Sequence, residues 1–174
     1  MELTKAIELI KPAANRFKKK ESWADLGCGN GLFTTALADL LHQGSVVYAV
    51  DKDKKALENI GTMKDVNLQK LVADFSRDAL PFSGLDGILM ANSLHFVRDK
   101  LSFINKCCGW LKNKGYFLLI EYDTDNSNPW VPYPISFPSA AMLFQQAGFK
   151  IINKLGSQPS LYNRANIYAA LIER

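Results

Sequence analysis

The 174-residue sequence predicts an α/β fold, with a doubly wound, mostly parallel seven-stranded sheet. Two observations favour this class. Short apolar runs alternate with helical patterns along most of the chain, as expected when helices connect parallel strands. The first run also ends in a glycine-rich turn at residues 27–31, and a helical pattern follows at once. Such a strand, turn and helix form the opening unit of many nucleotide-binding folds.

The elements follow from the local patterns taken in order. Residues 3–20 have apolar side chains near helical spacing, with Pro12 as an interruption, and residues 1–21 read as a helical N-terminal extension of one domain spanning 1–174. Strands are predicted at about 22–26, 45–50, 68–72, 85–90, 116–122, 150–155 and 167–172. Helices are predicted at about 32–41, 54–63, 99–111 with Asp99 as its cap, and from Ser139 to 147. No helical pattern separates the last two strands, so one of them is expected to run antiparallel.

Composition narrows the class of protein. Charged residues make up 22% and hydrophobic residues 48%, which is ordinary globular usage, and no apolar run is long enough to span a bilayer. The first residues lack a basic leader followed by an apolar block, so no secretory signal is expected. Cys28, Cys107 and Cys108 lack the spacing of a metal site and predict reduced thiols in a cytoplasmic protein. The net charge of +4 is compatible with acidic substrates or nucleic acid and requires neither.

The spacing of the glycines points to one family. A dinucleotide fingerprint, G-x-G-x-x-G, would place its third glycine at Leu32, and no Gly-Lys-Ser/Thr string indicates a phosphate loop. The string from Asp25 to Gly31, Asp-Leu-Gly-Cys-Gly-Asn-Gly, closely resembles the first motif of the class I S-adenosylmethionine-dependent methyltransferases. The resemblance covers nearly the whole chain from Trp23. It implies S-adenosyl-L-methionine as the cofactor and methyl transfer as the activity.

Residues at strand ends are the candidates for cofactor binding, because ligands of open parallel sheets lie beyond the carboxyl ends of the strands. Asp51 ends the second strand, where a carboxylate can accept from both ribose hydroxyls; the alternative is a helix cap, for which Asp53 is better placed. By the resemblance, Asp74 and Phe75 carry the adenine, although Asp74 also suits a plain turn. By the same resemblance, the other residues of the expected cofactor site form the glycine loop, contact the methionine end or cover the adenine ring. These residues are Asp25, Gly27, Cys28, Gly29, Gly31, Lys52 and Asn92.

Catalysis from a sulfonium donor depends mainly on aligning the acceptor and excluding water, so a general base is needed only when the acceptor holds its proton. His95 follows the fourth predicted strand and is the candidate base. The alternative is structural, since a Leu-His segment occurs at this place in small methyltransferases of varied substrate. Cys28 is interpreted as a small filler between glycines and not as a nucleophile.

Two segments are placed to recognise the acceptor. The loop at 123–138 contains Trp130 and Tyr133 among prolines, and the connection at 156–166 contains Tyr162 and Arg164. These side chains are predicted to hold a small, partly apolar or aromatic molecule; the alternative is ordinary packing of a loop on the sheet. The run 18–20 of three lysines is interpreted as a solvated helix end, with a nucleic-acid contact as the alternative.

Other activities remain as alternatives to a small-molecule methyltransferase. An enzyme acting on RNA, DNA or protein is one, but amino-directed nucleic-acid enzymes carry an Asn/Asp-Pro-Pro-Tyr-like string where this chain has Asn92-Ser93-Leu94-His95. A non-catalytic S-adenosylmethionine-binding protein is another, and the intact glycines and Asp51 weigh against it. A nicotinamide oxidoreductase is disfavoured by Leu32.

Overall fold

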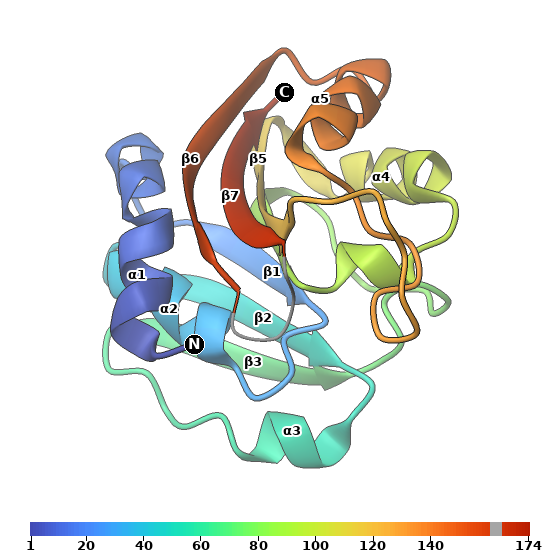
Figure 1. Ribbon diagram of the computed structural model, residues 1–174. Helices are drawn as coiled ribbons and strands as arrows, with labels where there is room; N and C mark the ends of the chain where they lie inside the picture. Colours follow the sequence, from blue (N-terminus) through green and yellow to red (C-terminus); the bar gives the residue numbers. More distant parts are fainter. Residues whose placement is uncertain (161–164) are drawn as a thin grey trace.

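The computed structural model describes residues 1–160 and 165–174, and in this part of the chain seven strands form one sheet in the order β3-β2-β1-β4-β5-β7-β6 (Figure 1). Neighbouring strands from β3 to β5 are parallel, and β7 is antiparallel to both β5 and β6. The predicted fold class is therefore confirmed, including the single antiparallel strand near the C-terminus. The strands are β1 (Ser22–Leu26), β2 (Ser45–Asp51), β3 (Val66–Val72), β4 (Leu85–Ala91), β5 (Leu111–Tyr122), β6 (Ile151–Pro159) and β7 (Asn166–Glu173).

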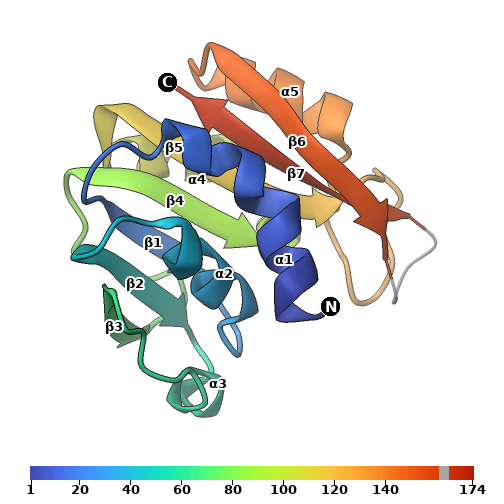
Figure 2. The same ribbon diagram turned by 90° about the vertical axis from the view of Figure 1, so that its left-hand side faces the viewer.

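Helices cover both faces of the sheet (Figures 1 and 2). One face carries α1 (Leu3–Ile10), its 3-10 continuation η1 (Lys11–Arg16) and α2 (Leu32–Leu40), with α3 (Lys54–Glu58) beside β2 and β3. The other face carries α4 (Lys100–Cys108) and α5 (Phe137–Gln146), while the short η2 (Leu94–Phe96) follows β4.

The core is divided by the sheet into two hydrophobic clusters. Trp23 lies in the cluster beneath α1 and α2, with Phe17 edge-on to its ring at 5.3 Å between centroids. Phe117 and Phe144 lie in the cluster beneath α4 and α5, at 5.0 Å between centroids. Every residue of β4 from Leu85 to Met90 is buried, as expected for a central parallel strand with a mostly apolar sequence.

The N-terminal segment is packed into this core. Its α-helix ends at Ile10, just before Pro12, and continues as a 3-10 turn, so the predicted interruption is confirmed. Ala6, Ile10 and Ala13 have no exposed surface, and α1 packs on α2 and on β6. Residues 3–16 thus help to bury one face of the sheet.

Several predicted boundaries differ from the structure. Helix α4 ends at Cys108, and β5 begins at Leu111 because that residue pairs with the start of β4 ahead of a bulge. Helix α5 is capped by Ser136, whose Oγ accepts from the Ser139 N–H, so the predicted cap at Ser139 is wrong. Helix α3 stops at Glu58, earlier than expected, and β6 extends to Pro159. Asp99 caps α4 as predicted, accepting from Ser102 N–H at 3.1 Å.

No helix within residues 1–160 and 165–174 is long and apolar enough to cross a membrane. Across the same residues, no group of three or more His, Cys, Asp or Glu side chains is arranged to hold a metal ion.

Candidate functional site

The turn between β1 and α2 is held against β2 and is open on its outer side. The backbone N–H groups of Gly27 and Cys28 both donate to the Val50 carbonyl, at 2.8 and 3.1 Å. Gly27, Gly29 and Gly31 have φ values of 78°, 52° and 78°, which favour glycine. A Cβ at Gly27 would lie 2.7 Å from the Cβ of Ser93, whereas a Cβ at Gly29 would meet no atom within 4 Å. Gly29 therefore faces open space that a ligand can enter.

Asp51 lies at the end of β2, beside this turn. Its Oδ2 accepts from the Gly29 N–H at 2.8 Å, and its Oδ1 accepts from the Asp53 N–H at 2.9 Å. Each carboxylate oxygen can accept a further hydrogen bond, so Asp51 keeps capacity for a ligand. Asp53, not Asp51, caps α3 by accepting from Lys55 and Ala56 N–H groups, as the sequence predicts.

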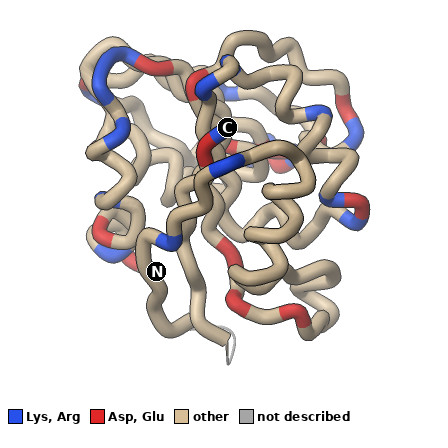
Figure 3. The backbone as a smooth tube through the Cα atoms, turned by 90° about the horizontal axis from the view of Figure 1, so that it is seen from above, with Lys and Arg blue, Asp and Glu red and all other residues tan. Residues whose placement is uncertain are grey.

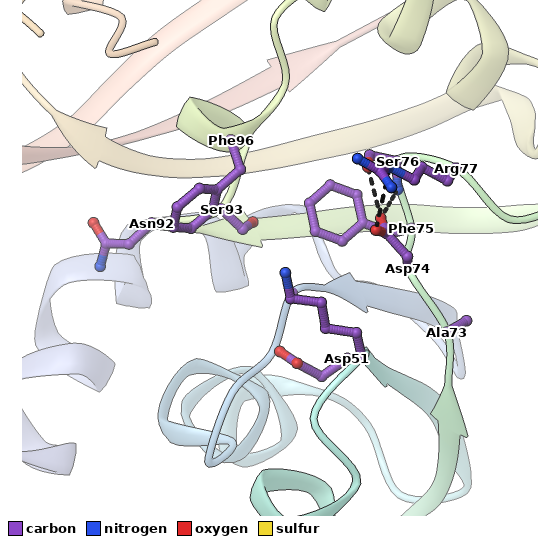
Figure 4. Close-up of a pocket in the computed structure, with 11 residues that line it drawn as sticks. Asp51, Ala73, Asp74, Phe75, Ser76, Arg77, Asn92, Ser93 and Phe96 are labelled. Atoms are coloured by element: carbon purple, nitrogen blue, oxygen red, sulfur yellow. Dashed lines mark hydrogen bonds and ion pairs between the residues drawn. The ribbon is translucent and has the colours of Figure 1, made fainter. Parts of the chain in front are cut away.

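A cavity of about 380 Å³ lies beyond the carboxyl ends of β1 to β4 (Figure 4). Among the residues predicted to bind the cofactor, it is lined by Gly27, Asp51, Lys52, Asp74, Phe75 and Asn92. The remaining lining residues, which the sequence analysis did not single out, are Ala73, Ser76, Arg77, Ser93 and Phe96. They directly follow β3 and β4, so the signal that selected Asp74 and Asn92 would have found them too.

Asp74 organises the turn that places an aromatic ring at the cavity. Its Oδ1 accepts from the Ser76 hydroxyl at 2.6 Å and from the Ser76 N–H at 3.0 Å (Figure 4). These hydrogen bonds hold the pKa of the Asp74 carboxyl below its usual range. Phe75 packs edge-to-face on Phe103 at 5.7 Å, which fixes its ring in the wall. Asp74 therefore stabilises a turn, which was the alternative role, and also lines the cavity.

Asp25 is buried beneath the glycine turn and does not line the cavity. Thr34 Oγ1 donates to its Oδ2 at 2.6 Å, and its Oδ1 has no hydrogen-bond partner among the described residues. Burial raises the pKa of Asp25 to about 7; the negative charge of Asp51 adds to the rise, and the Thr34 hydrogen bond opposes it. A buried carboxyl with one unpartnered oxygen is suited to a nearby positive charge.

Cys28 points into the structure and not into the cavity. Its side chain packs against the small cluster of Ala49, Leu57 and Ile60. Burial raises the pKa of the Cys28 thiol well above its usual value, so the side chain is a neutral filler. This environment agrees with the interpretation of Cys28 as a spacer between the glycines.

The exit of β4 is pinned to both neighbouring strands. Ser93 Oγ donates to the Leu26 carbonyl at 2.6 Å, and Asn92 N–H donates to the Ile120 carbonyl at 2.8 Å. Asn92 has a φ of 53°, the positive value that asparagine tolerates better than most residues. Its Oδ1 is buried and has no partner among the described residues.

His95 belongs to a buried pair that the sequence analysis missed. Its Nδ1 lies 2.8 Å from Glu121 Oε2, and its backbone N–H donates to Glu121 Oε1 at 3.1 Å. Glu121 is fully buried near the end of β5, and the His95 ring lies 4.3 Å from the Phe96 ring and 6.0 Å from the Tyr122 ring, measured between centroids. His95 does not line the 380 Å³ cavity, although its neighbour Phe96 does. The carboxylate fixes the orientation of the imidazole.

Two of the residues predicted to hold the acceptor, Trp130 and Tyr133, do not line this cavity. Trp130 is 80% exposed and lines none of the cavities described here. Tyr133 lines a shallow groove beside the cavity, with Lys100 Nζ 5.6 Å from its ring centroid. Tyr162 and Arg164 lie outside the described residues. The loop itself is held by Asp125, which accepts from the Ser136 N–H at 2.9 Å.

Comparison with known protein families decides the class of protein. Residues 24–119, more than half of the chain, match the family described as "Methyltransferase domain". The chain belongs to this family. The sequence resemblance is confirmed, and the protein is an S-adenosylmethionine-dependent methyltransferase. No curated protein matches the chain.

Solved structures share the fold of this methyltransferase at low sequence identity. A SAM-dependent methyltransferase from Aquifex aeolicus is 17% identical with a TM-score of 0.64, covering 99% of this chain and 98% of that one. The 1,6-didemethyltoxoflavin-N1-methyltransferase of Burkholderia thailandensis is 17% identical with a TM-score of 0.70, covering 99% and 77%. The magnesium protoporphyrin IX methyltransferase of Synechocystis is 14% identical with a TM-score of 0.67, covering 97% and 77%. These likenesses establish the class I methyltransferase fold.

Proposed function

We propose that this methyltransferase acts on a small-molecule acceptor and binds S-adenosylmethionine in the cavity at the ends of β1 to β4. The cofactor site is supported by one observation: residues that follow four separate strands, β1 to β4, line a single cavity. Its volume of about 380 Å³ is within the usual range of small-molecule sites, ~300–1000 Å³. Gly29 leaves room at the turn, and Asp51 keeps unused acceptor capacity.

The residues around the cavity have distinct roles in this proposal. Asp51 accepts from the two ribose hydroxyls, while Asp74 and Phe75 bind the adenine. Asp25, with its unpartnered Oδ1, attracts the methionine ammonium and orients the turn above it. Asn92 lies at the methionine end, and the stem of Lys52 covers the exposed side of the ring.

The cofactor, when bound, supplies a methyl group that its own sulfonium charge already activates. The protein's contribution is to orient the two ligands and to exclude water. His95 would remove a proton only for an acceptor that holds one and that reaches the imidazole, which is buried and does not line the cofactor cavity. Glu121 then keeps the imidazole in one orientation, and the alternative is that the pair is purely structural.

A small acceptor is supported by the sequence after β4 and by the balance of charge. The Asn92-Ser93-Leu94-His95 string lacks the prolines of the amino-methylation motif. Figure 3 shows positive and negative residues interspersed around the molecule. The Burkholderia structure was solved with a small molecule, 1,6-didemethyltoxoflavin, and S-adenosylhomocysteine bound. Methylation of RNA or protein, and cofactor binding without catalysis, are the competing functions.

A thermal-shift experiment tests the proposed cofactor site. S-adenosylmethionine and S-adenosylhomocysteine should raise the Tm in a concentration-dependent way, because a ligand bound only by the folded state stabilises it. NAD and ATP serve as controls and should leave the Tm unchanged at the same concentrations. A shift with NAD and none with S-adenosylmethionine would contradict the proposal.

A further inference from the structure

A second cavity, of about 650 Å³, lies next to the first and shares only Asn92 with it. Its walls come from α1, the start of α2, the ends of β4, β5 and β6, and the start of β7. They include Lys5, Leu32, Phe33, Asn92, Tyr122 and Gln158. Gln158 Nε2 donates to the Met1 sulfur at 3.3 Å, so the end of β6 meets the start of α1 at this cavity. Neither Trp130 nor Tyr133, the two described residues predicted to bind the acceptor, lines it.

Asn92 joins the two cavities, because it lines both. In Figure 4 its side chain extends away from the ring of Phe75, on the opposite side of the site. It combines a positive φ with a buried amide oxygen that has no partner among the described residues. Backbone strain and unpartnered buried polar atoms both concentrate at functional sites.

We infer that the second cavity is the site of the methyl acceptor. This inference rests on the proposed function, since the first cavity must hold the cofactor for the second to receive the acceptor. Ligands in the two cavities would meet at Asn92, with the methionine end on one side and the acceptor on the other. The aromatic loop around Trp130 is then not the main determinant of specificity.

The lining defines the chemistry of the acceptor. Leu32, Phe33 and Ile167 supply apolar walls, with Ile167 only 5% exposed and Phe33 only 6%. At the junction, the unpartnered oxygen of Asn92 calls for an N–H or O–H donor on the ligand. Lys5 is exposed and forms no ion pair with a described residue. Glu2 lines the cavity beside Lys5, so this end offers both charges. The cavity thus suits a compact, mostly apolar molecule with a hydrogen-bond donor at its inner end and a polar group near α1.

A bulky cofactor analogue tests the position of the acceptor site without knowledge of the acceptor. The probe is an S-adenosylmethionine analogue in which a benzyl group replaces the methyl group on sulfur. The benzyl group marks the space that an acceptor occupies. In Gln158→Trp, an indole fills the second cavity; Lys5→Trp, at an exposed position of α1, fills it from the other side if the first variant does not fold.

Two control variants match these changes. Gln69→Trp places the same side chain on the opposite edge strand, at an exposed position that lines neither cavity. Trp130→Ala removes the exposed aromatic ring of the loop. Calorimetry then gives the affinity of each folded variant for S-adenosylmethionine and for the benzyl analogue.

We expect Gln158→Trp and Lys5→Trp to weaken binding of the benzyl analogue by roughly tenfold or more and to change S-adenosylmethionine affinity by less than about twofold. The two controls should bind both compounds like the unmodified protein. Loss of analogue binding in Trp130→Ala, or unchanged binding in both cavity variants, would overturn the acceptor site and leave the cofactor site intact. Failure of the unmodified protein to bind S-adenosylmethionine would instead overturn the proposed function and the inference that rests on it.

Discussion

Asp51 has two contacts in the structure and further capacity for a third and fourth, which separates it from the neighbouring Asp53. The carboxylate of Asp51 ties down the glycine turn through Gly29, whereas that of Asp53 caps a short helix. Two aspartates of similar sequence context therefore have different expected effects when removed. Comparing the two alanine variants separates an effect on cofactor binding from an effect on local stability.

Asp51→Ala should weaken S-adenosylmethionine binding by roughly 2–4 kcal/mol, because charge-assisted hydrogen bonds to both ribose hydroxyls are lost. Asp53→Ala should change the affinity by less than about twofold while lowering stability by roughly 0.5–2 kcal/mol through loss of the cap. Isothermal titration calorimetry on both folded variants measures the difference. Equal affinities in the two variants would remove Asp51 from the site.

Asp25 gives a pH dependence of stability whose sign follows from its raised pKa. The folded protein holds the proton with a pKa of about 7, and an unfolded chain holds it with a pKa of about 3.9. Since the folded state binds this proton more tightly, the contribution of Asp25 favours folding at low pH and is lost as the pH rises from about 4 to 7. Asp25→Asn removes this titration and keeps an acceptor for Thr34.

We therefore compare the free energies of unfolding in urea at pH 5 and at pH 8. The value for Asp25→Asn, relative to that of the unmodified protein, should rise by about 3 kcal/mol from pH 5 to pH 8. Other titrating groups are shared by both proteins and cancel in the difference. A stability difference that stays constant between pH 5 and pH 8 would show that Asp25 is ionised throughout this range.

Strand ends explain which of these side chains were found from the sequence. Asp51, Asp74 and Asn92 each follow a recognisable apolar run, and parallel strands bring such ends together at one edge. Glu121 was missed because its role depends on a partner, His95, that is distant in sequence and lies on another strand exit. Contacts of that kind are set by tertiary packing and leave no local pattern.

The turn between β1 and α2 illustrates how an element combines backbone strain with ligand access. Its central glycine, Gly29, and the exposed Gly84 before β4 both have positive φ, and a Cβ at either position would meet no atom within 4 Å. Only Gly29 lies at the carboxyl end of the parallel strands, while Gly84 lies at the other end of β4. The two glycines thus form a matched pair for mutation.

Gly29→Val and Gly84→Val should each cost about 1–2 kcal/mol of stability, from a branched residue in a left-handed conformation. Gly29→Val alone should abolish detectable S-adenosylmethionine binding, because its side chain occupies the space next to the cofactor. Thermal melts and calorimetry separate the two effects. Normal binding by folded Gly29→Val would mean that the turn does not contact the ligand.

Elements with strong periodic patterns were predicted well, and their ends less so. Strand β1 was predicted to the residue, since polar Glu21 and the glycines bound its apolar run. The start of β5 was missed because residues 112–114 are polar and resemble a helix end. In the structure they lie in an irregular stretch of β5, between Leu111 and Tyr116, which both pair with β4. Sheet pairing overrides local preference at such positions.

Segments near the two ends of the chain pack against each other. Helix α1 packs on α2 and on β6, and Arg16 pairs with Glu173 near the C-terminus. Ile10 has no exposed surface, whereas Leu3 on the same helix is 40% exposed. If residues 1–21 belong to one cooperative domain with the sheet, damage at Ile10 must lower the stability of the entire fold.

Ile10→Ala should destabilise the protein by roughly 2–5 kcal/mol, as expected for a large-to-small change in a packed core. Leu3→Ala should cost less than about 1 kcal/mol. Urea unfolding followed by circular dichroism should show a single transition in both variants. A separate early transition in Ile10→Ala would instead make the N-terminal segment an independent unit.

The distribution of charge sets the last expectation, which concerns the class of substrate. Lys18, Lys19 and Lys20 are exposed and precede β1, at the edge of the sheet opposite the two cavities. Changing all three to Gln should leave S-adenosylmethionine affinity within about twofold, and should not alter methyl incorporation from radiolabelled cofactor into a mixture of small molecules. Nucleic-acid binding, by contrast, depends on phosphate contacts and weakens steeply with salt. Methyl transfer to bulk RNA that falls between about 50 and 200 mM salt, and falls again in the triple variant, would replace the small-molecule acceptor with RNA.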